Sequence, residues 1–86
     1  MPYDLYILSS QSADKYYIGS SKDPIRRLHY HNTIEKGFTS RYRPWRIVFV
    51  LKFPSKEAAQ AAERKVKSWK SREMIDRLIR GEIKLI

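Results

Sequence analysis

One long run of β-branched and aromatic residues, Trp45-Arg46-Ile47-Val48-Phe49-Val50-Leu51-Lys52-Phe53, stands out in this chain. A run of this length and apolarity is typical of a strand in the middle of a sheet. We therefore expect residues 45–53 to form a central strand that anchors the core. A chain of 86 residues has room for one such core and little more. Residues 1–86 are thus expected to form a single domain.

Two shorter β-like segments, residues 3–8 and 15–19, precede this run and are separated by the polar residues 9–14. Their composition and spacing predict a β-hairpin. If the hairpin is symmetric about Gln11 and Ser12, Tyr6 and Tyr17 lie opposite one another and project from the same face of the sheet. Tyrosine is common in strands, so neither phenol identifies a site by itself.

Three helices are predicted from capping signals. Asp23-Pro24 starts the first, because the carboxylate can accept an amide proton while proline fits the first turn. We expect this helix to run to about Lys36 and to end at Gly37. Two serine-capped helices follow the long strand, at about residues 55–70 and 71–80. The expected fold is α+β, in the order β-β-α-β-α-α.

The composition favours a polyanionic partner. The chain contains eighteen Lys and Arg residues and nine Asp and Glu residues, which gives a formal net charge of +9. Such a charge attracts nucleic acid by electrostatic steering and counterion release. The alternatives are a well-solvated basic protein and a protein that sits near acidic lipid.

Cysteine is absent, which excludes disulfides and thiolate metal sites. The N-terminal residues do not have the pattern of a signal peptide, and the apolar stretches are too short to span a bilayer. We therefore expect a cytoplasmic protein that does not enter a membrane.

Three further residues carry side chains suited to phosphate chemistry. Arg27 and His31 are four residues apart on the first predicted helix, so they share one side of it. Exposed basic helices often contain such pairs, and the pair alone is weak evidence. Glu63 lies among alanines in the middle of the second predicted helix, where a partly packed carboxylate needs a partner. That partner is either a basic side chain, Arg27 or a lysine on a neighbouring element, or Mg²⁺, which takes one or two carboxylates.

Taken together, these segments resemble a stand-alone, single-domain member of the GIY-YIG nuclease family, similar to the N-terminal domain of excinuclease C. Tyr17-Ile18-Gly19 matches the second signature of the family, and Asp4-Leu5-Tyr6 stands at the first and keeps only its tyrosine. The resemblance continues through Gly19–Asp23, Arg27-Leu28, His31-Asn32, Arg43-Pro44-Trp45 and Ser55–Trp69. It implies a three-stranded antiparallel sheet flanked by helices, a divalent cation, Mg²⁺ with Mn²⁺ as the alternative, and hydrolysis of DNA.

Taken residue by residue, the resemblance implies a set of roles. Glu63 holds the metal and Arg27 neutralises the scissile phosphate. Tyr6 and Tyr17 handle the attacking water, with Tyr6 as general base and His31 relaying or orienting its proton. A phenol with a pKa near ~10 is a poor base at neutral pH, so the site must favour the phenolate, with Arg27, His31 and the metal as the groups able to do so. One metal is expected, because no second carboxylate cluster is present. Gly19 and Asn32 belong to the structural part of the motif.

The remaining cations predict a substrate groove. Residues 41–46 alternate charge with aromatic rings, a pattern typical of surfaces that hold phosphates and stack on unpaired bases. The competing interpretation makes Trp45 the first core residue of its strand, and makes the lysines of residues 65–70 a solvated helix face. The expected nucleic-acid contacts are Lys22, Arg41, Arg43, Arg46 and Lys67.

No element that reads base sequence is recognisable, so we expect an endonuclease of DNA repair or recombination that selects a flap, a branch or a single strand. RNA remains an alternative substrate, and the chain is expected to be a monomer or a weak homodimer. Two other interpretations stay open. The first is a catalytically silent nucleic-acid-binding module of the same fold, which the altered Asp4-Leu5-Tyr6 segment favours. The second is a small basic protein that docks on a larger assembly.

Overall fold

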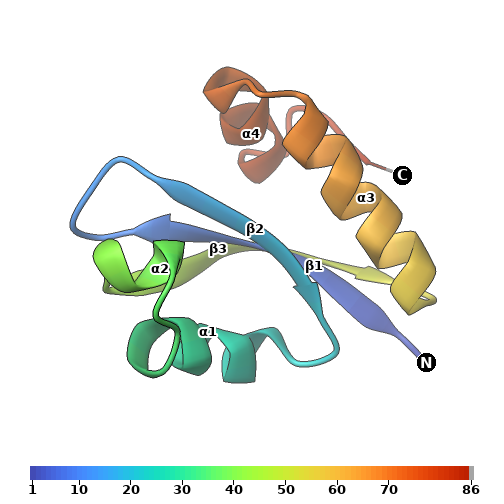
Figure 1. Ribbon diagram of the computed structural model, residues 1–86. Coiled ribbons are helices and arrows are strands. Elements are labelled where there is room, and N and C mark those ends of the chain that lie inside the picture. The colour runs from blue at the N-terminus through green and yellow to red at the C-terminus, as the bar shows by residue number, and fades with distance from the viewer. Residues whose placement is uncertain (86) are drawn as a thin grey trace.

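The computed structural model describes residues 1–85, which contain three strands and four helices (Figure 1). The elements are β1 (Tyr3–Ser10), β2 (Tyr16–Ser21), α1 (Pro24–Thr33), α2 (Phe38–Arg41), β3 (Trp45–Phe53), α3 (Lys56–Ser68) and α4 (Arg72–Ile79). The α+β class and the three-stranded antiparallel sheet are confirmed. The single turn of α2 is an addition to the expected order.

The sheet has the strand order β2-β1-β3, with β1 antiparallel to both neighbours. The prediction that residues 45–53 form the central strand is therefore wrong, because β3 lies at an edge and leaves Val50 47% exposed. The centre is β1, in which all four residues from Leu5 to Leu8 are buried. The apolar character of β3 has another cause: the C-terminal residues Ile83 and Leu85 pack with it around the core.

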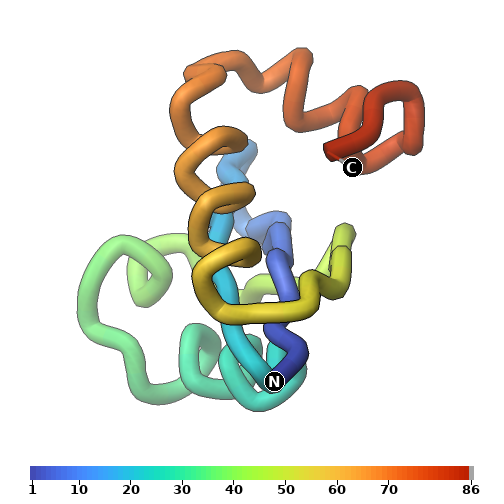
Figure 2. The backbone as a smooth tube through the Cα atoms, turned by 90° about the vertical axis from the view of Figure 1, so that its right-hand side faces the viewer, coloured from blue at the N-terminus to red at the C-terminus, as the bar shows by residue number. Residues whose placement is uncertain are grey.

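Helices cover both faces of the sheet (Figure 1). Alternate residues of β1 point to opposite faces. Leu5 and Ile7 pack in one cluster with residues of α3 and α4, whereas Tyr6 and Leu8 pack in a second cluster on the side of α1 and α2. Seen from the side, α4 lies at the end of the molecule away from α1 (Figure 2). Tyr6 therefore enters the α1 side of the sheet from its most buried strand.

The predicted capping residues start the helices as expected. Asp23 accepts a hydrogen bond from the amide of Arg26, and serines 55 and 71 do the same at the starts of α3 and α4. The helix ends differ from the prediction. α1 ends at Thr33 rather than Lys36, because the carboxylate of Glu35 accepts from the amides of residues 36 and 37 and so forms a turn. α3 ends at Ser68, since Lys70 has a left-handed backbone with φ of 48°.

Candidate active site

The register of the β1–β2 hairpin sets the positions of the two signature tyrosines. Tyr6 pairs with Gly19, and Tyr17 pairs with Leu8, so the two phenols are not directly opposite as the symmetric hairpin predicted. The turn is shifted because Ser10 bonds to Lys15 and its hydroxyl accepts from two amides of the turn. A shift of two residues preserves the face of every side chain. The rings of Tyr6 and Tyr17 consequently share one face, with centroids 6.3 Å apart.

Gly19 allows the phenol of Tyr6 to lie against the neighbouring strand. A Cβ at this position would stand 2.6 Å from the Tyr6 hydroxyl oxygen and 2.8 Å from its Cζ. It would also come within 3.1 Å of the Tyr17 ring. Tyr6 is 1% exposed and has no free space to retreat into. The glycine of the motif is therefore required by this close approach.

We expect Gly19→Ala to lower the free energy of unfolding by about 1–3 kcal/mol, the range typical of overpacking in a close-packed interior. Gly37→Ala is the matched control, because its nearest neighbour is the flexible carboxylate of Glu35 at 3.2 Å. Urea denaturation of both variants measures the difference. Equal stability of the two variants would show that the contact with Tyr6 does not constrain residue 19.

A chain of hydrogen bonds runs from Tyr6 into the protein. The Tyr6 hydroxyl lies 3.0 Å from Nε2 of His31, and Nδ1 of His31 lies 3.2 Å from the hydroxyl of Thr39. His31 and Thr39 are each 1% exposed. The His31 ring also packs against Tyr17, with centroids 4.5 Å apart. Thr39 comes from α2, and sequence reasoning missed it because a threonine in a polar loop carries no distinguishing pattern.

Burial keeps both members of the Tyr6–His31 pair neutral. It raises the pKa of Tyr6 to about 12, although Arg27, close to the phenol, acts in the opposite direction. Burial, with Arg27 as the next cause, lowers the pKa of His31 to about 4. A neutral imidazole supplies no positive charge to hold a phenolate, so the expectation that His31 does so is not supported. In this pair His31 is a hydrogen-bond partner, and Arg27 is the cation that favours the phenolate.

The low pKa of His31 makes stability depend on pH. The folded protein holds the imidazole with a pKa of about 4, against 6.5 for an unperturbed histidine, so the unfolded chain binds more protons between these values. We expect the free energy of unfolding to fall as the pH drops from about 6.5 towards 4, by up to about 3 kcal/mol. Urea denaturation at pH 7, 6 and 5 measures this loss.

Two variants identify the group responsible for that loss. His31→Gln should be less stable than the parent chain at pH 7 and should lose less of its stability on acidification. His29→Gln, at an exposed position of the same helix, should keep the full dependence on pH. A His31→Gln variant with an unchanged pH dependence would assign the loss to other groups.

Arg27 extends from α1 towards the same phenols. Its guanidinium carbon lies 4.5 Å from the centroid of the Tyr30 ring, a cation–π arrangement that limits its motion. It is half-buried and close enough to the Tyr6 phenol to act against the rise of its pKa. The expected pairing of Arg27 and His31 on one side of the helix is therefore realised around Tyr6.

Glu63 reaches the edge strand β2 from the other face of the sheet. Its Oε1 accepts a hydrogen bond from the hydroxyl of Ser20 at 2.7 Å, and its Oε2 pairs with Nζ of Lys67 at 2.7 Å. Ser20 directly follows Gly19 on β2. β2 is an edge strand, and both Arg27 of α1 and Glu63 of α3 act electrostatically on the Tyr6 phenol. The basic partner of Glu63 is Lys67 of the same helix, so the expectation of Arg27 or a lysine on a neighbouring element is wrong.

The donor set around Glu63 fits a hard cation held by one carboxylate. Within residues 1–85 no group of three or more His, Cys, Asp and Glu residues is placed to hold a metal ion. Mg²⁺ commonly takes one or two carboxylates and completes its coordination with water and substrate phosphate. The side chain of Glu63 is 21% exposed, and that of Lys67 is 52% exposed, so the ion pair is accessible to solvent and displaceable.

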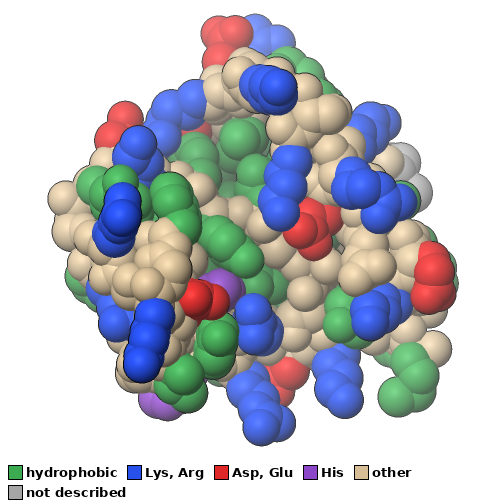
Figure 3. All heavy atoms as spheres, in the orientation of Figure 1, with side chains coloured by type: hydrophobic (Ala, Val, Ile, Leu, Met, Phe, Trp, Pro, Cys, Tyr) green, Lys and Arg blue, Asp and Glu red, His purple; other side chains and the backbone are tan. Residues whose placement is uncertain are grey.

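The predicted nucleic-acid contacts occupy different environments. Lys22, Arg41 and Arg46 are exposed. Lys67 is paired with Glu63. Arg43 donates to the backbone carbonyls of His31 and Glu35, so its guanidinium holds the segment after α1 in place. Lys and Arg side chains are spread over the face of the molecule shown in Figure 3, with acidic side chains scattered among them.

The aromatic residues of the predicted groove are mostly part of the core. Trp45 is 3% exposed, and its indole N–H donates to the carbonyl of Thr39, which agrees with its interpretation as a core residue. Asn32 holds the start of β3 by bonding both the amide and the carbonyl of Trp45. The exposed ring of this region is Phe38, which is 47% exposed and lies 5.0 Å from the Tyr42 ring. Sequence reasoning did not select Phe38, because it belongs to the unpredicted helix α2.

Comparisons with known proteins agree with this geometry. Residues 2–76 match the family model of the GIY-YIG catalytic domain. The solution NMR structure of the UPF0213 protein BH0048 from Bacillus halodurans superposes with a TM-score of 0.58 and 33% sequence identity. That match covers 92% of this chain and 83% of the other.

Two fungal relatives carry the name structure-specific endonuclease subunit SLX1. The protein from Cryptococcus neoformans var. neoformans serotype D is 40% identical over 93% of this chain, and that from Schizosaccharomyces japonicus is 48% identical over 69%. The matched parts amount to 18% and 24% of those proteins. The chain thus corresponds to less than a quarter of the length of each relative. Among residues 1–85, no helix combines the length and hydropathy needed to cross a membrane.

Proposed function

The chain belongs to the GIY-YIG nuclease family, and we propose that it is a metal-dependent endonuclease that cuts DNA at flaps, branches or single strands. The observation that carries this proposal is the presence of three kinds of group at and around the Tyr6 phenol. Arg27 supplies a fixed cation, the Tyr6–His31 pair supplies a proton acceptor, and Glu63 supplies a carboxylate. Phosphodiester hydrolysis needs each of them.

Arg27 binds the scissile phosphate and stabilises the negative charge that grows on it in the transition state. The Tyr30 ring beside its guanidinium restricts the arginine before substrate arrives, so less side-chain freedom is lost on binding. Loss of this cation would destabilise the transition state more than the ground state. A lysine at position 27 would keep the charge and lose the planar contact with phosphate.

Tyr6 orients the attacking water, and its hydroxyl accepts the water proton as its own proton passes to Nε2 of His31. Burial keeps His31 neutral at neutral pH, with a pKa of about 4, and its Nε2 lies within hydrogen-bond distance of the Tyr6 hydroxyl, so the ring takes up that proton only transiently, as a weak base. Thr39 bonds the opposite ring nitrogen and fixes the ring orientation. Tyr17 packs on the ring from the other side.

Glu63 would hold the divalent cation, Mg²⁺ or Mn²⁺, with the carboxylate that now pairs with Lys67. When bound, the cation supplies Lewis-acid stabilisation of phosphate charge. Ser20 keeps the carboxylate beside β2 through its hydrogen bond to Oε1. The hydroxyl of Ser20 is therefore a positioning group for Glu63.

The substrate preference follows from what the surface offers. Exposed cations can hold a phosphate backbone of any sequence, and the exposed ring of Phe38 offers a stacking surface for an unpaired base. The relatives named as structure-specific endonuclease subunits support the same preference. Their name also supports action as part of a larger assembly.

A panel of labelled substrates tests the preference. Single-stranded, duplex, flapped and branched DNA and matched RNA are incubated with the protein and Mg²⁺, and the products are separated on denaturing gels. We expect cutting near the junction of the flapped or branched DNA, or in the single strand, and little cutting of the plain duplex. Equal cutting of the plain duplex would contradict structure selection.

A catalytically silent binding module is the second candidate, since residues 4 and 5 depart from the first family signature. In the structure, the altered residue 5 lies away from the catalytic tyrosine proposed here. Leu5 is fully buried in the cluster on the α3 side of the sheet, away from the phenol of Tyr6. Binding without strand scission on every substrate of the panel would favour this candidate.

A further inference from the structure

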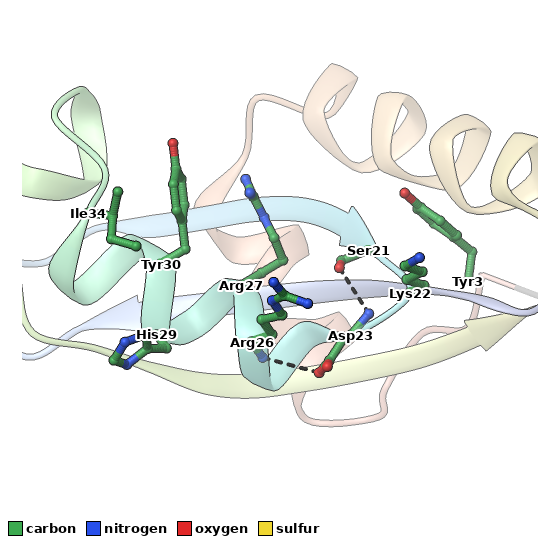
Figure 4. A pocket seen from close by; sticks show the side chains of 9 residues that line it. All are labelled: Tyr3, Ser21, Lys22, Asp23, Arg26, Arg27, His29, Tyr30 and Ile34. Atoms are coloured by element: carbon green, nitrogen blue, oxygen red, sulfur yellow. Dashed lines mark hydrogen bonds between the residues drawn. The ribbon is translucent and has the colours of Figure 1, made fainter.

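A cavity of about 580 Å³ lies between α1 and the start of the loop that follows β2 (Figure 4). Its volume is within the range of ligand sites. Arg27 and Tyr30 rise side by side from α1 along one wall, and Tyr3 and Lys22 stand at the opposite end. Arg26 lies between them. The cavity therefore includes the arginine that acts on Tyr6 and continues along α1 to the end of β2 at Ser21.

The lining of the cavity is cationic. It includes Lys22, Arg26 and Arg27, against one acidic residue, Asp23. The carboxylate of Asp23 accepts from the Arg26 amide as the cap of α1. The ion pairs found within residues 1–85 involve none of the three cations. Three positive side chains thus face one space with no carboxylate paired to them.

We propose that this cavity binds the nucleotide next to the scissile phosphate in the strand that is cut, with Arg26 contacting its phosphate. This inference rests on the proposed function and adds a subsite to it. Arg27 belongs to both the cavity and the site around Tyr6, so it stands at the boundary between two successive phosphates. Arg26 and Lys22 are placed to hold the second phosphate, and Tyr3 offers a ring to the sugar or base.

Arg26 provides the cleanest test because it is exposed and its side chain makes no hydrogen bond or ion pair in the described part of the chain. Arg26→Ala should fold normally. The matched control is Arg77→Ala, which removes an exposed arginine of α4 at the far end of the molecule. Far-UV circular dichroism checks the fold of both variants.

The first measurement is binding of flapped DNA by fluorescence anisotropy in EDTA, at several salt concentrations, so that it does not depend on cleavage. We expect Arg26→Ala to weaken binding about tenfold and to reduce the slope of log affinity against log salt by about 0.7–0.9, the value of one phosphate contact. Arg77→Ala should change neither quantity by a comparable amount. Equal effects of the two variants would overturn the inference.

The second measurement locates the phosphate. Single phosphates of the DNA are replaced one at a time by neutral methylphosphonates, and binding is measured for the parent chain, Arg26→Ala and Arg27→Ala. Replacing the phosphate that Arg27 contacts should weaken DNA binding by the parent chain but not by the Arg27→Ala variant. This difference identifies that phosphate. We expect Arg26 to contact the adjacent phosphate. Replacing that phosphate should therefore not weaken DNA binding by the Arg26→Ala variant.

The outcomes separate this inference from the proposed function. One outcome is that Arg26 and Arg27 are each coupled to a phosphate, but to two phosphates that are not adjacent. That result would overturn the inference and leave the proposed function intact. Binding with the expected coupling but without cleavage would support the subsite and contradict the nuclease. Absence of DNA binding by the parent chain would overturn both.

Discussion

Glu63→Gln is expected to reduce the rate of DNA cleavage about 10³-fold or more, because an amide is a poor substitute for the single carboxylate proposed to hold the metal. The substitution keeps the size of the side chain and can keep the hydrogen bond from Ser20. It also removes a negative charge from the proposed DNA-binding surface, so affinity for DNA should be unchanged or slightly higher. Single-turnover cleavage and binding in EDTA measure the two quantities separately.

Glu57→Gln is the matched control. Glu57 is an exposed glutamate in the first turn of the same helix, away from Ser20 and β2. This variant should cleave at nearly the parent rate. If Glu63→Gln cleaves as fast as Glu57→Gln, the carboxylate is not the metal ligand and the proposed site is wrong.

Tyr6→Phe is expected to reduce kcat about 10²–10⁴-fold with little change in KM, the effect typical of losing an acid–base group that acts in the transition state. The ring of Tyr6 is packed in the core cluster with Leu8 and Trp45, and phenylalanine preserves that packing. The hydroxyl lost by the variant is the one that bonds Nε2 of His31. Steady-state kinetics on the best substrate of the panel measure the two constants.

Tyr16→Phe is the control for removal of a hydroxyl. Its phenol donates to Asp76 of α4 and is not part of the cluster around Tyr6. We expect its kcat to stay close to the parent value. A Tyr6→Phe variant that retains full activity would show that the phenol is not the proton acceptor. His31 would then be the next candidate for that role.

Local signals predicted most of the secondary structure. The aromatic and β-branched composition of β1 and β2, the cap at Asp23 and the serine caps at residues 55 and 71 all act within a few residues, so the sequence displays them directly. The strand order depends on contacts between distant segments. An apolar run such as β3 has the same sequence pattern whether it lies at the centre of a sheet or at an edge that other segments cover.

The site was predictable to the extent that its residues belong to a family pattern. Tyr6, Tyr17, Arg27, His31 and Glu63 were selected in this way. Their mutual geometry was not, because it depends on a hairpin register set by the turn at Ser10. Thr39 and Phe38 were missed with α2, and the structural role of Arg43 is visible only through the carbonyls that it contacts.

The measurement that tests the central claim most directly is single-turnover cleavage of flapped DNA by the purified chain, in Mg²⁺ and in EDTA, beside Glu63→Gln purified in the same way. The side-by-side variant excludes a contaminating nuclease. Our account predicts strand scission by the parent chain in Mg²⁺, none in EDTA, and none by the variant under either condition. Salt-dependent binding without scission in Mg²⁺ or Mn²⁺, or equal scission by the variant, would contradict it.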